Sequence, residues 1–236
     1  MRPAHFALLL SVLAALLLLV AGPGTRVALW DYGTGFQLMR WAGFAGLAAA
    51  GLAAVLLLLP RTRRGGPAWL VVALALGLST AFVPWNALRQ ARALPPIHDI
   101  TTDTQRPPEF VAILPLRAAA PNPAAYGGPE VAQAQAGAYP DLRTRRMDAA
   151  PAEAFKRALQ AARDMGWEIV AADAAAGRIE ATDTTFWFGF KDDVVIRVEA
   201  DGAGSRVDVR SVSRVGVGDV GANARRIRAY LRALGT

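Results

Sequence analysis

DVVIRVEADGAGSRVDVRSVS, residues 193–213, decides the fold. Two runs in which apolar and polar residues alternate, 193–200 and 205–213, flank the sequence DGAG. Alternation with a period of two is typical of a β-strand that buries one face. A two-residue turn containing glycine supplies the positive φ that a tight hairpin needs. The stretch therefore predicts an antiparallel hairpin.

The flanking sequence extends this hairpin into an α+β domain. Before it, PAEAFKRALQAARDMGW (151–167) has helical periodicity, and strand-like runs follow at 167–172 and 178–184. After it, residues 219–234 have the pattern of an amphipathic helix. We expect a two-layer domain over residues 148–236, in which a four-stranded antiparallel sheet is covered on one face by two helices.

The same alternation assigns the strand residues to two faces. The side chains expected to face the helices are apolar: Ile179, Ala181, Val194, Ile196, Val198, Val207 and Val209. The side chains expected on the open face are charged: Arg178, Glu180, Arg197, Glu199, Arg206, Asp208 and Arg210. Pairing opposite charges across neighbouring strands places Glu180 beside Arg197 and Arg197 beside Asp208. The charges thus predict an exposed row of these three residues.

The first 94 residues have a different composition. Three apolar segments, at about 4–22, 36–59 and 67–85, are each long enough to cross a hydrocarbon core of about 30 Å. This part carries eight arginines and one acidic residue, which accounts for the net charge of +7 of the whole chain. Because residues 95–236 are neutral overall, the basic charge gives no evidence for nucleic acid as a partner.

Arginine placement predicts the orientation of these spans. Arg61, Arg63 and Arg64 lie in a short loop between the second and third spans, and such loops are typically cytoplasmic. The amino terminus would then be cytoplasmic, and residues 95–236 would lie in the periplasm, as part of a multi-pass inner membrane protein. Other arginines favour the opposite orientation less strongly: Arg26, Arg40, Arg89 and Arg92.

Residues 95–147 are rich in proline and alanine, which argues against long helices. We expect an extended tether that wraps the soluble domain, with EFVAIL (109–114) as a short strand. The whole chain has no cysteine and only two histidines, His5 and His98. Thiolate chemistry is therefore excluded, and little remains for a histidine-based metal or general-base site.

Several blocks of the carboxy-terminal part resemble an uncharacterised family, domain of unknown function 1499. They are IHDITTDTQRPPEF, YPDL, GRIEATDTTFWFGFKDDVVIRV and RVDVRSVSRVGVGDVGANARRIRAYL, which occur in this order over about residues 95–236. The resemblance implies a membrane-tethered or exported protein, and a three-span amino terminus is common among its bacterial relatives. It implies no activity.

RVGVGDVGANARR, residues 214–226, contains G-x-G-x-x-G at Gly216, Gly218 and Gly221. A dinucleotide-binding motif of this kind must open a βαβ unit, with an acidic residue about 20 positions further on. Here the expected sheet is antiparallel, and the sequence ends 15 residues after Gly221. We therefore expect no dinucleotide.

The same glycines predict a joint between the last strand and the last helix. Asp219 is placed to cap the helix by accepting from the amide of Gly221 or Ala222. We expect Arg214 to pair with Asp219, with Arg225 as a second candidate, and Asn223 to bond back to the loop. A phosphate-binding loop is the alternative interpretation.

Three aspartates, Asp183, Asp192 and Asp193, bracket the loop TFWFGFK and are expected at one end of a hairpin. Carboxylates in a cluster can bind Mg²⁺ or Ca²⁺. More often they form turns and pair with basic neighbours, so we expect no metal. Together with the joint, these positions give the candidate binding residues: Arg210, Arg214, Asp219, Asn223, Asp192, Asp193 and Arg197.

FWFGF, residues 186–190, has two interpretations. In the first, its rings close the end of the hydrophobic core, which we favour because exposed apolar patches are rare on soluble domains. In the second, the rings form an exposed cluster that faces lipid or a partner.

The residue inventory favours a protein that is not an enzyme. No cysteine, few histidines and no nucleophile motif point to a membrane-anchored binding or assembly module on the outer face of the inner membrane. It would use the edge of strand 205–213 and the start of the last helix. The alternative is a metal-assisted hydrolase that uses the aspartates. The expected partners are the lipid bilayer and a membrane or periplasmic protein of unknown identity, with no cofactor and no nucleic acid.

Overall fold

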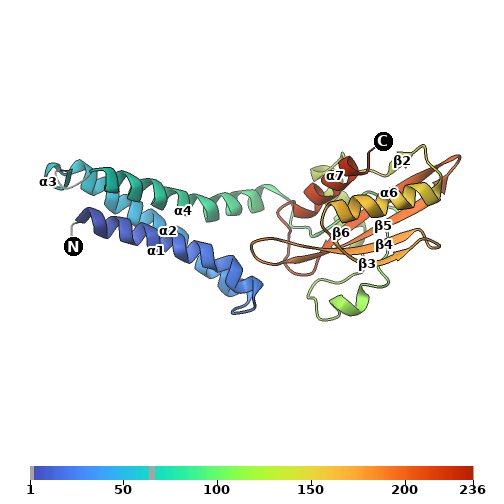
Figure 1. Cartoon of the computed structure of the whole chain (residues 1–236), viewed down its shortest axis with the longest axis horizontal. Helices are drawn as coiled ribbons and strands as arrows, with labels where there is room; N and C mark the ends of the chain where they lie inside the picture. The colour runs from blue at the N-terminus through green and yellow to red at the C-terminus, as the bar shows by residue number, and fades with distance from the viewer. Residues whose placement is uncertain (1–2, 64–66, 236) are drawn as a thin grey trace. The chain divides into compact units, whose positions relative to one another are not determined.

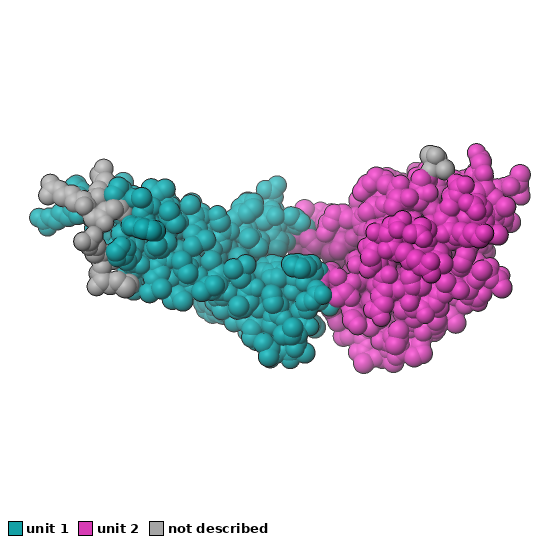
Figure 2. Space-filling view, in the orientation of Figure 1, with its two compact units in different colours: residues 1–90, 186–189 teal, residues 91–185, 190–236 magenta. Residues whose placement is uncertain are grey.

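A computed structural model describes residues 3–63 and 67–235, so Arg64 of the predicted cytoplasmic loop lies outside the described residues. The chain forms two compact units, which Figure 2 distinguishes by colour. Unit 1 contains residues 1–90 together with the short segment Phe186–Gly189. Unit 2 contains residues 91–185 and 190–236.

The described residues up to Ala93 contain helices α1 (Pro3–Arg26), α2 (Tyr32–Leu58), α3 (Pro60–Arg63) and α4 (Pro67–Ala93). Helices α1, α2 and α4 are long and apolar enough to cross a membrane, with mean hydropathies of 2.6, 2.0 and 1.8. Helices α1 and α4 contain the predicted spans 4–22 and 67–85 and continue beyond them, whereas α2 begins four residues before the predicted span 36–59 and ends one residue short of it. The part of the chain that the structure describes therefore has three candidate membrane spans.

Small residues let the helices of unit 1 approach closely. A Cβ on Gly46 of α2 would lie 2.8 Å from the carbonyl oxygen of Gly77 in α4. The hydroxyl of Ser11 in α1 donates to the carbonyl of Ala73 in α4 over 2.8 Å. Close backbone approach through small residues is typical of helices that pack in lipid, where dispersion contacts replace the hydrophobic effect.

Unit 2 is an α+β domain built on an antiparallel sheet (Figure 1). Its strands are β1 (Asp99–Thr101), β2 (Arg145–Met147), β3 (Glu168–Asp173), β4 (Arg178–Thr184), β5 (Lys191–Asp201) and β6 (Gly204–Ser213). Its helices are η1 (Leu114–Arg117), α5 (Gly128–Ala138), α6 (Pro151–Asp164) and α7 (Ala222–Ala233). The strand order is β1-β6-β5-β4-β3, and β2 also pairs with β6.

The central hairpin of β5 and β6 has the predicted register. Asp201 pairs with Gly204, which leaves a two-residue turn in which Gly202 has φ +60°. Arg197 lies opposite Asp208, as expected. The prediction from the DGAG sequence is confirmed.

The register between β4 and β5 differs from the prediction by two residues. Glu180 lies opposite Val195, and Arg197 lies opposite Arg178. A two-residue shift keeps every side chain on its own face, so the apolar pattern does not discriminate between the two registers. The negative charge of Glu180 is not compensated by Arg197. Three successive main-chain N–H groups, from residues 111, 112 and 113, donate to its carboxylate over 2.9–3.1 Å.

The sheet has six strands rather than the four predicted. The two additional strands, β1 and β2, come from the proline-rich segment and pair with β6, so the outer edge of β6 is not free. The expected strand at 109–114 is absent, because those residues turn and direct their N–H groups toward Glu180. The segment also contains the 11-residue helix α5, which has Pro129 in its first turn, where the missing N–H costs no helical hydrogen bond.

The main hydrophobic core of unit 2 joins the helices to one face of the sheet. All seven apolar strand residues expected to face the helices are buried in this core, together with Phe155 of α6 and Tyr230 of α7. Figure 1 shows α6 and α7 alongside the strands. On the opposite face, Phe110 and Ile113 pack with Val195 and Val212. The charged face is therefore covered by the segment that follows β1 and is not open.

Candidate functional site

Asp208 on β6 is fully buried and collects hydrogen bonds on the charged face. Its carboxylate accepts from Arg197 and Arg206, each at 2.9 Å, and from the hydroxyl of Thr144 at 2.5 Å. Asp103, which follows β1, accepts from the same two arginines at 2.8 Å. Burial alone would raise the pKa of Asp208, but hydrogen bonds from Thr144, Arg197 and Arg206 outweigh it and hold the pKa below its usual value.

The predicted row of Glu180, Arg197 and Asp208 is therefore only partly formed. Arg197 and Asp208 are neighbours on the predicted face, whereas Glu180 is displaced along the sheet by the register of β4. None of the three lies on an exposed face, since Glu180 and Asp208 are fully buried and Arg197 is 14% exposed.

Arg210 is buried rather than exposed as predicted. Its guanidinium makes a bidentate pair with Asp99 of β1, with N···O distances of 2.9 and 2.7 Å. The ring centroids of Phe110 and Tyr126 lie 5.3 and 5.4 Å from the guanidinium carbon, and two main-chain carbonyls accept two of its three remaining N–H groups. A bidentate pair of this kind satisfies both charges away from water.

Asp193 forms a second buried ion cluster on the same face of the sheet. Its carboxylate accepts from Arg214 at 2.8 and 2.9 Å, from Arg117 of η1 at 3.1 Å, and from the hydroxyl of Thr182 at 2.8 Å. The sequence predicted that Arg214 pairs with Asp219. In the structure Arg214 binds Asp193 instead, so this prediction is wrong.

Asp192 lies on the helix side of the sheet, as adjacent strand residues face opposite ways. It accepts from Arg226 of α7 at 2.6 Å, and Arg226 also binds Asp183 at 2.7 Å. Asn223 accepts from Arg226 at 2.5 Å and from the hydroxyl of Ser211 at 2.6 Å. This cluster fixes the first turn of α7 to β5 and β6.

The three aspartates of the alternative metal site do not converge. Asp183 and Asp192 are paired across the hairpin and share Arg226, whereas Asp193 faces the other side of the sheet. Among the residues that the structure describes, no group of three or more His, Cys, Asp or Glu side chains is arranged to hold a metal ion.

The strand-to-helix joint has the predicted cap in a shifted position. Asp219 accepts from the amides of Gly221 and Asn223, both at 2.7 Å, but the residue at the N-cap position is Gly221, with φ +73°. Burial raises the pKa of Asp219, and the two amide hydrogen bonds offset this in part. The side chain of Asn223 donates to the carbonyl of His98 and to Ser213, so it joins the helix to the strands rather than to the loop.

Sequence reasoning missed Asp99, Arg117 and Arg226, which provide the opposite charges for the candidate residues. A signal existed for Arg226, because it shares a helix face with Asn223, Ile227 and Tyr230, all of which are buried. No pattern indicated Asp99 or Arg117, which reach their partners from a segment without regular periodicity.

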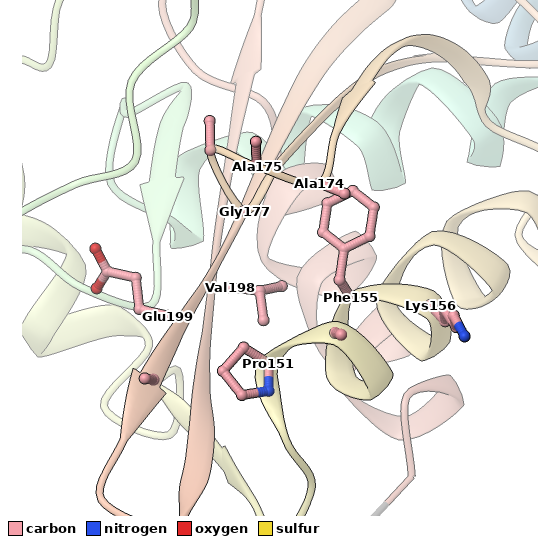
Figure 3. A pocket seen from close by; sticks show the side chains of 11 residues that line it. Pro151, Phe155, Lys156, Ala174, Ala175, Gly177, Val198 and Glu199 are labelled. Carbon is pink, nitrogen blue, oxygen red and sulfur yellow. The ribbon is translucent and has the colours of Figure 1, made fainter.

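A shallow cleft of about 570 Å³ lies where the start of α6 approaches β5 and the turn after β3 (Figure 3). It is lined by Pro151, Ala152, Phe155, Lys156, Ala174, Ala175, Ala176, Gly177, Val198, Glu199 and Ala200. Most of these residues are small or apolar, and its titratable residues are Lys156 and Glu199. The Glu199 carboxylate points away from the cleft in Figure 3 and pairs with Arg106 on the opposite face.

The loop between β4 and β5 resolves the two interpretations of FWFGF. Phe188 is buried, but its ring packs 5.0 Å from that of Phe36 in α2 and does not join the main core of unit 2. Phe186 is 91% exposed. The interpretation that these rings close the sheet core is wrong for both residues, because Phe186–Gly189 belongs to unit 1.

Comparison with known proteins places the carboxy-terminal part in a family. The family described as protein of unknown function (DUF1499) matches residues 99–234. No curated protein matches the chain. The matched range begins at the first residue of β1 and ends just after α7, so it includes the proline-rich segment that completes the sheet. With more than half of its length matched, the chain belongs to the DUF1499 family of proteins of unknown function.

Proposed function

We propose that this protein is a non-catalytic binding or assembly module, anchored in the inner membrane with its DUF1499 unit on the periplasmic face. This proposal rests mainly on one observation: the charged side chains that could act as catalytic or metal-binding groups are used in ion pairs that stabilise the domain. Asp192, Asp193 and Arg210 each bind an opposite charge within 3.1 Å and are almost completely buried. Groups held in this way are not available to a substrate without breaking the domain.

Membrane anchoring is supported by the three long apolar helices, and the periplasmic side by the arginines between α2 and α4. A phosphatase reporter that is active only in the periplasm, fused after Thr236, tests this side. We expect activity from the phosphatase fusion and none from a matched fusion to a reporter that fluoresces only in the cytoplasm. The reverse pattern would contradict the periplasmic location.

A metal-assisted hydrolase is the competing function, and it requires the aspartates to leave their arginines. Thermal unfolding of the full chain in lipid nanodiscs, with Mg²⁺ or Ca²⁺ against matched ionic strength of Na⁺, separates the two. We expect no specific stabilisation. A shift with divalent ions that Asp193→Asn removes would favour the hydrolase.

A binding module should also contact a partner through a defined surface in intact cells. Ala175 lines the cleft and Gln133 lies on the exposed side of α5, so both positions accept a photo-crosslinking residue without disturbing the core. We expect a discrete crosslinked species from Ala175 and none from Gln133. Equal, diffuse labelling at both positions would contradict a specific binding surface on this side.

A further inference from the structure

A segment of unit 1 far from the helices in sequence fits a notch at the end of α1. A Cβ on Gly22 would collide with the indole of Trp187, and a Cβ on Gly35 would lie 3.0 Å from the ring of Phe188. Glycine at these two positions therefore leaves the space that the two rings occupy. The segment Phe186–Gly189 is thus fitted to α1 and α2.

Polar contacts hold the same segment in place. Pro23 has no N–H, so the carbonyl of Leu19, four residues earlier, lacks its usual helical donor. The indole N–H of Trp187 donates to this carbonyl over 3.5 Å. In addition, Arg26, the last residue of α1, donates to the carbonyl of Phe186 over 2.6 Å. These contacts fix the main chain of Phe186 beside the end of α1.

This fixed geometry leaves the ring of Phe186 outside the packing. Its side chain is 91% exposed, and the turn that follows Arg26 contains two further exposed apolar residues, Val27 at 65% and Leu29 at 72%. We call Val27, Leu29 and Phe186 the interface patch. Large apolar side chains exposed at and beside the end of one helix are unusual in water and typical of a surface that meets lipid or a partner.

We infer that the interface patch inserts into the lipid interface, with Phe186 as its anchor. This rests on the proposed membrane anchoring. The end of a span lies at the level of the headgroups, where aromatic rings are favoured and where arginine reaches the phosphates. Trp30 and Tyr32 lie in and just after the same turn, which gives this level the aromatic composition of a membrane interface. The ligand is therefore the bilayer surface itself.

The absence of cysteine from the chain allows a direct test with single-cysteine variants. A nitroxide spin label is placed at Phe186 or Leu29 in the patch, at Leu16 in the middle of α1, and at Ala203 in the exposed β5–β6 turn. All four side chains are exposed, so the labels disturb little packing. The full chain is reconstituted in vesicles of phosphatidylethanolamine and phosphatidylglycerol, and collision rates with oxygen and a water-soluble nickel chelate are measured.

We expect the ratio of oxygen to nickel accessibility at Phe186 and Leu29 to be several-fold above that at Ala203 and below that at Leu16. A ratio at Phe186 equal to that at Ala203, with Leu16 in lipid, would overturn this inference alone. An aqueous ratio at Leu16 would instead overturn the membrane anchoring on which it rests. A lipid-like ratio at Leu29 together with an aqueous ratio at Phe186 would also contradict the inference, because Phe186 would then not anchor the patch.

Discussion

Units 1 and 2 place their apolar and charged side chains in opposite ways. In the helices of unit 1 the buried positions are mostly alanine and glycine, while leucine, valine, phenylalanine and tryptophan point outward. In unit 2 the large apolar side chains are inside, and several charged side chains are buried with them. The first pattern fits a solvent of lipid and the second a solvent of water.

The contrast shows two ways of making a specific interior. Unit 1 uses glycine notches and close backbone approach, and its specificity depends on shape. Unit 2 uses buried ion pairs, whose partners come from β1, from the segment after it and from α7. Losing one member of such a pair leaves a buried charge without compensation, which costs more than most losses of shape.

The largest effect expected in unit 2 follows from removing the charge of Arg210. Arg210→Met leaves Asp99 buried and unpaired, so we expect the free energy of unfolding to fall by about 3–5 kcal/mol. Denaturant unfolding of the full chain in nanodiscs measures it. The matched control is Arg146→Ala, because the pair of Arg146 with Asp201 is exposed and should contribute about 0–1 kcal/mol. Equal effects of both variants would contradict the role given to buried pairs.

A smaller effect tests shape within unit 2. Gly177 has φ +61°, and a Cβ there would collide with the carbonyl oxygen of Val198, whose N–H donates to Gly177 over 2.7 Å. We expect Gly177→Ala to destabilise unit 2 by about 2–3 kcal/mol. Gly202 has a similar φ of +60° but nothing near its Cβ position, so Gly202→Ala should cost only about 1 kcal/mol. A larger loss from Gly202→Ala would contradict the collision at Gly177.

Acid should weaken unit 2 through Asp208. Because hydrogen bonds hold the pKa of Asp208 in the folded state below its unfolded value, its stabilisation is present above the unfolded pKa and is lost as pH falls through the folded pKa. We expect unfolding free energy to fall from about pH 5 downward and the fall to be shallower in Asp208→Asn. Asp141→Asn is the exposed control, since Arg228 also lowers the pKa of Asp141. If the unfolding free energy of Asp208→Asn falls with pH as steeply as that of the unsubstituted protein, groups other than Asp208 determine the acid sensitivity.

The smallest effect belongs to the notch of unit 1. Trp187→Phe removes the donor to the Leu19 carbonyl, and we expect a loss of about 0.5–1 kcal/mol at this long distance. Pro23→Ala supplies a helical N–H to the same carbonyl, so Trp187→Phe should cost less in that background. Additive effects of the two substitutions would show that the carbonyl does not couple them.

Local periodicity predicted much of the fold. The hairpin at 193–213, helices α6 and α7, the face of each apolar strand residue and the three apolar helices follow from spacing alone. The register of β4 did not follow, because a shift of two residues preserves the faces, and because Glu180 is bound mainly by main-chain N–H groups more than 60 residues away, in addition to Arg178.

The sequence predicted less of the candidate site than of the fold. Arg210 was expected to face outward and Arg214 to pair with Asp219, because the proline-rich segment with Asp99 and Arg117 has no periodicity and its contacts are long-range. The same segment supplies β1 and β2, which cover the edge of β6 that the sequence had offered as a binding surface. Proline-rich composition indicated a tether, but composition does not reveal pairing partners distant in sequence.

The central claim, a lipid-embedded unit 1 with unit 2 in the periplasm, is tested most directly by cysteine accessibility in intact cells. The chain has no cysteine, so Ala203→Cys in the exposed β5–β6 turn and Gly65→Cys in the arginine loop of the sequence each introduce a unique thiol. With the outer membrane permeabilised, a membrane-impermeant maleimide should label Ala203→Cys at once and Gly65→Cys only after lysis. Labelling of Gly65→Cys with protection of Ala203→Cys would contradict the account.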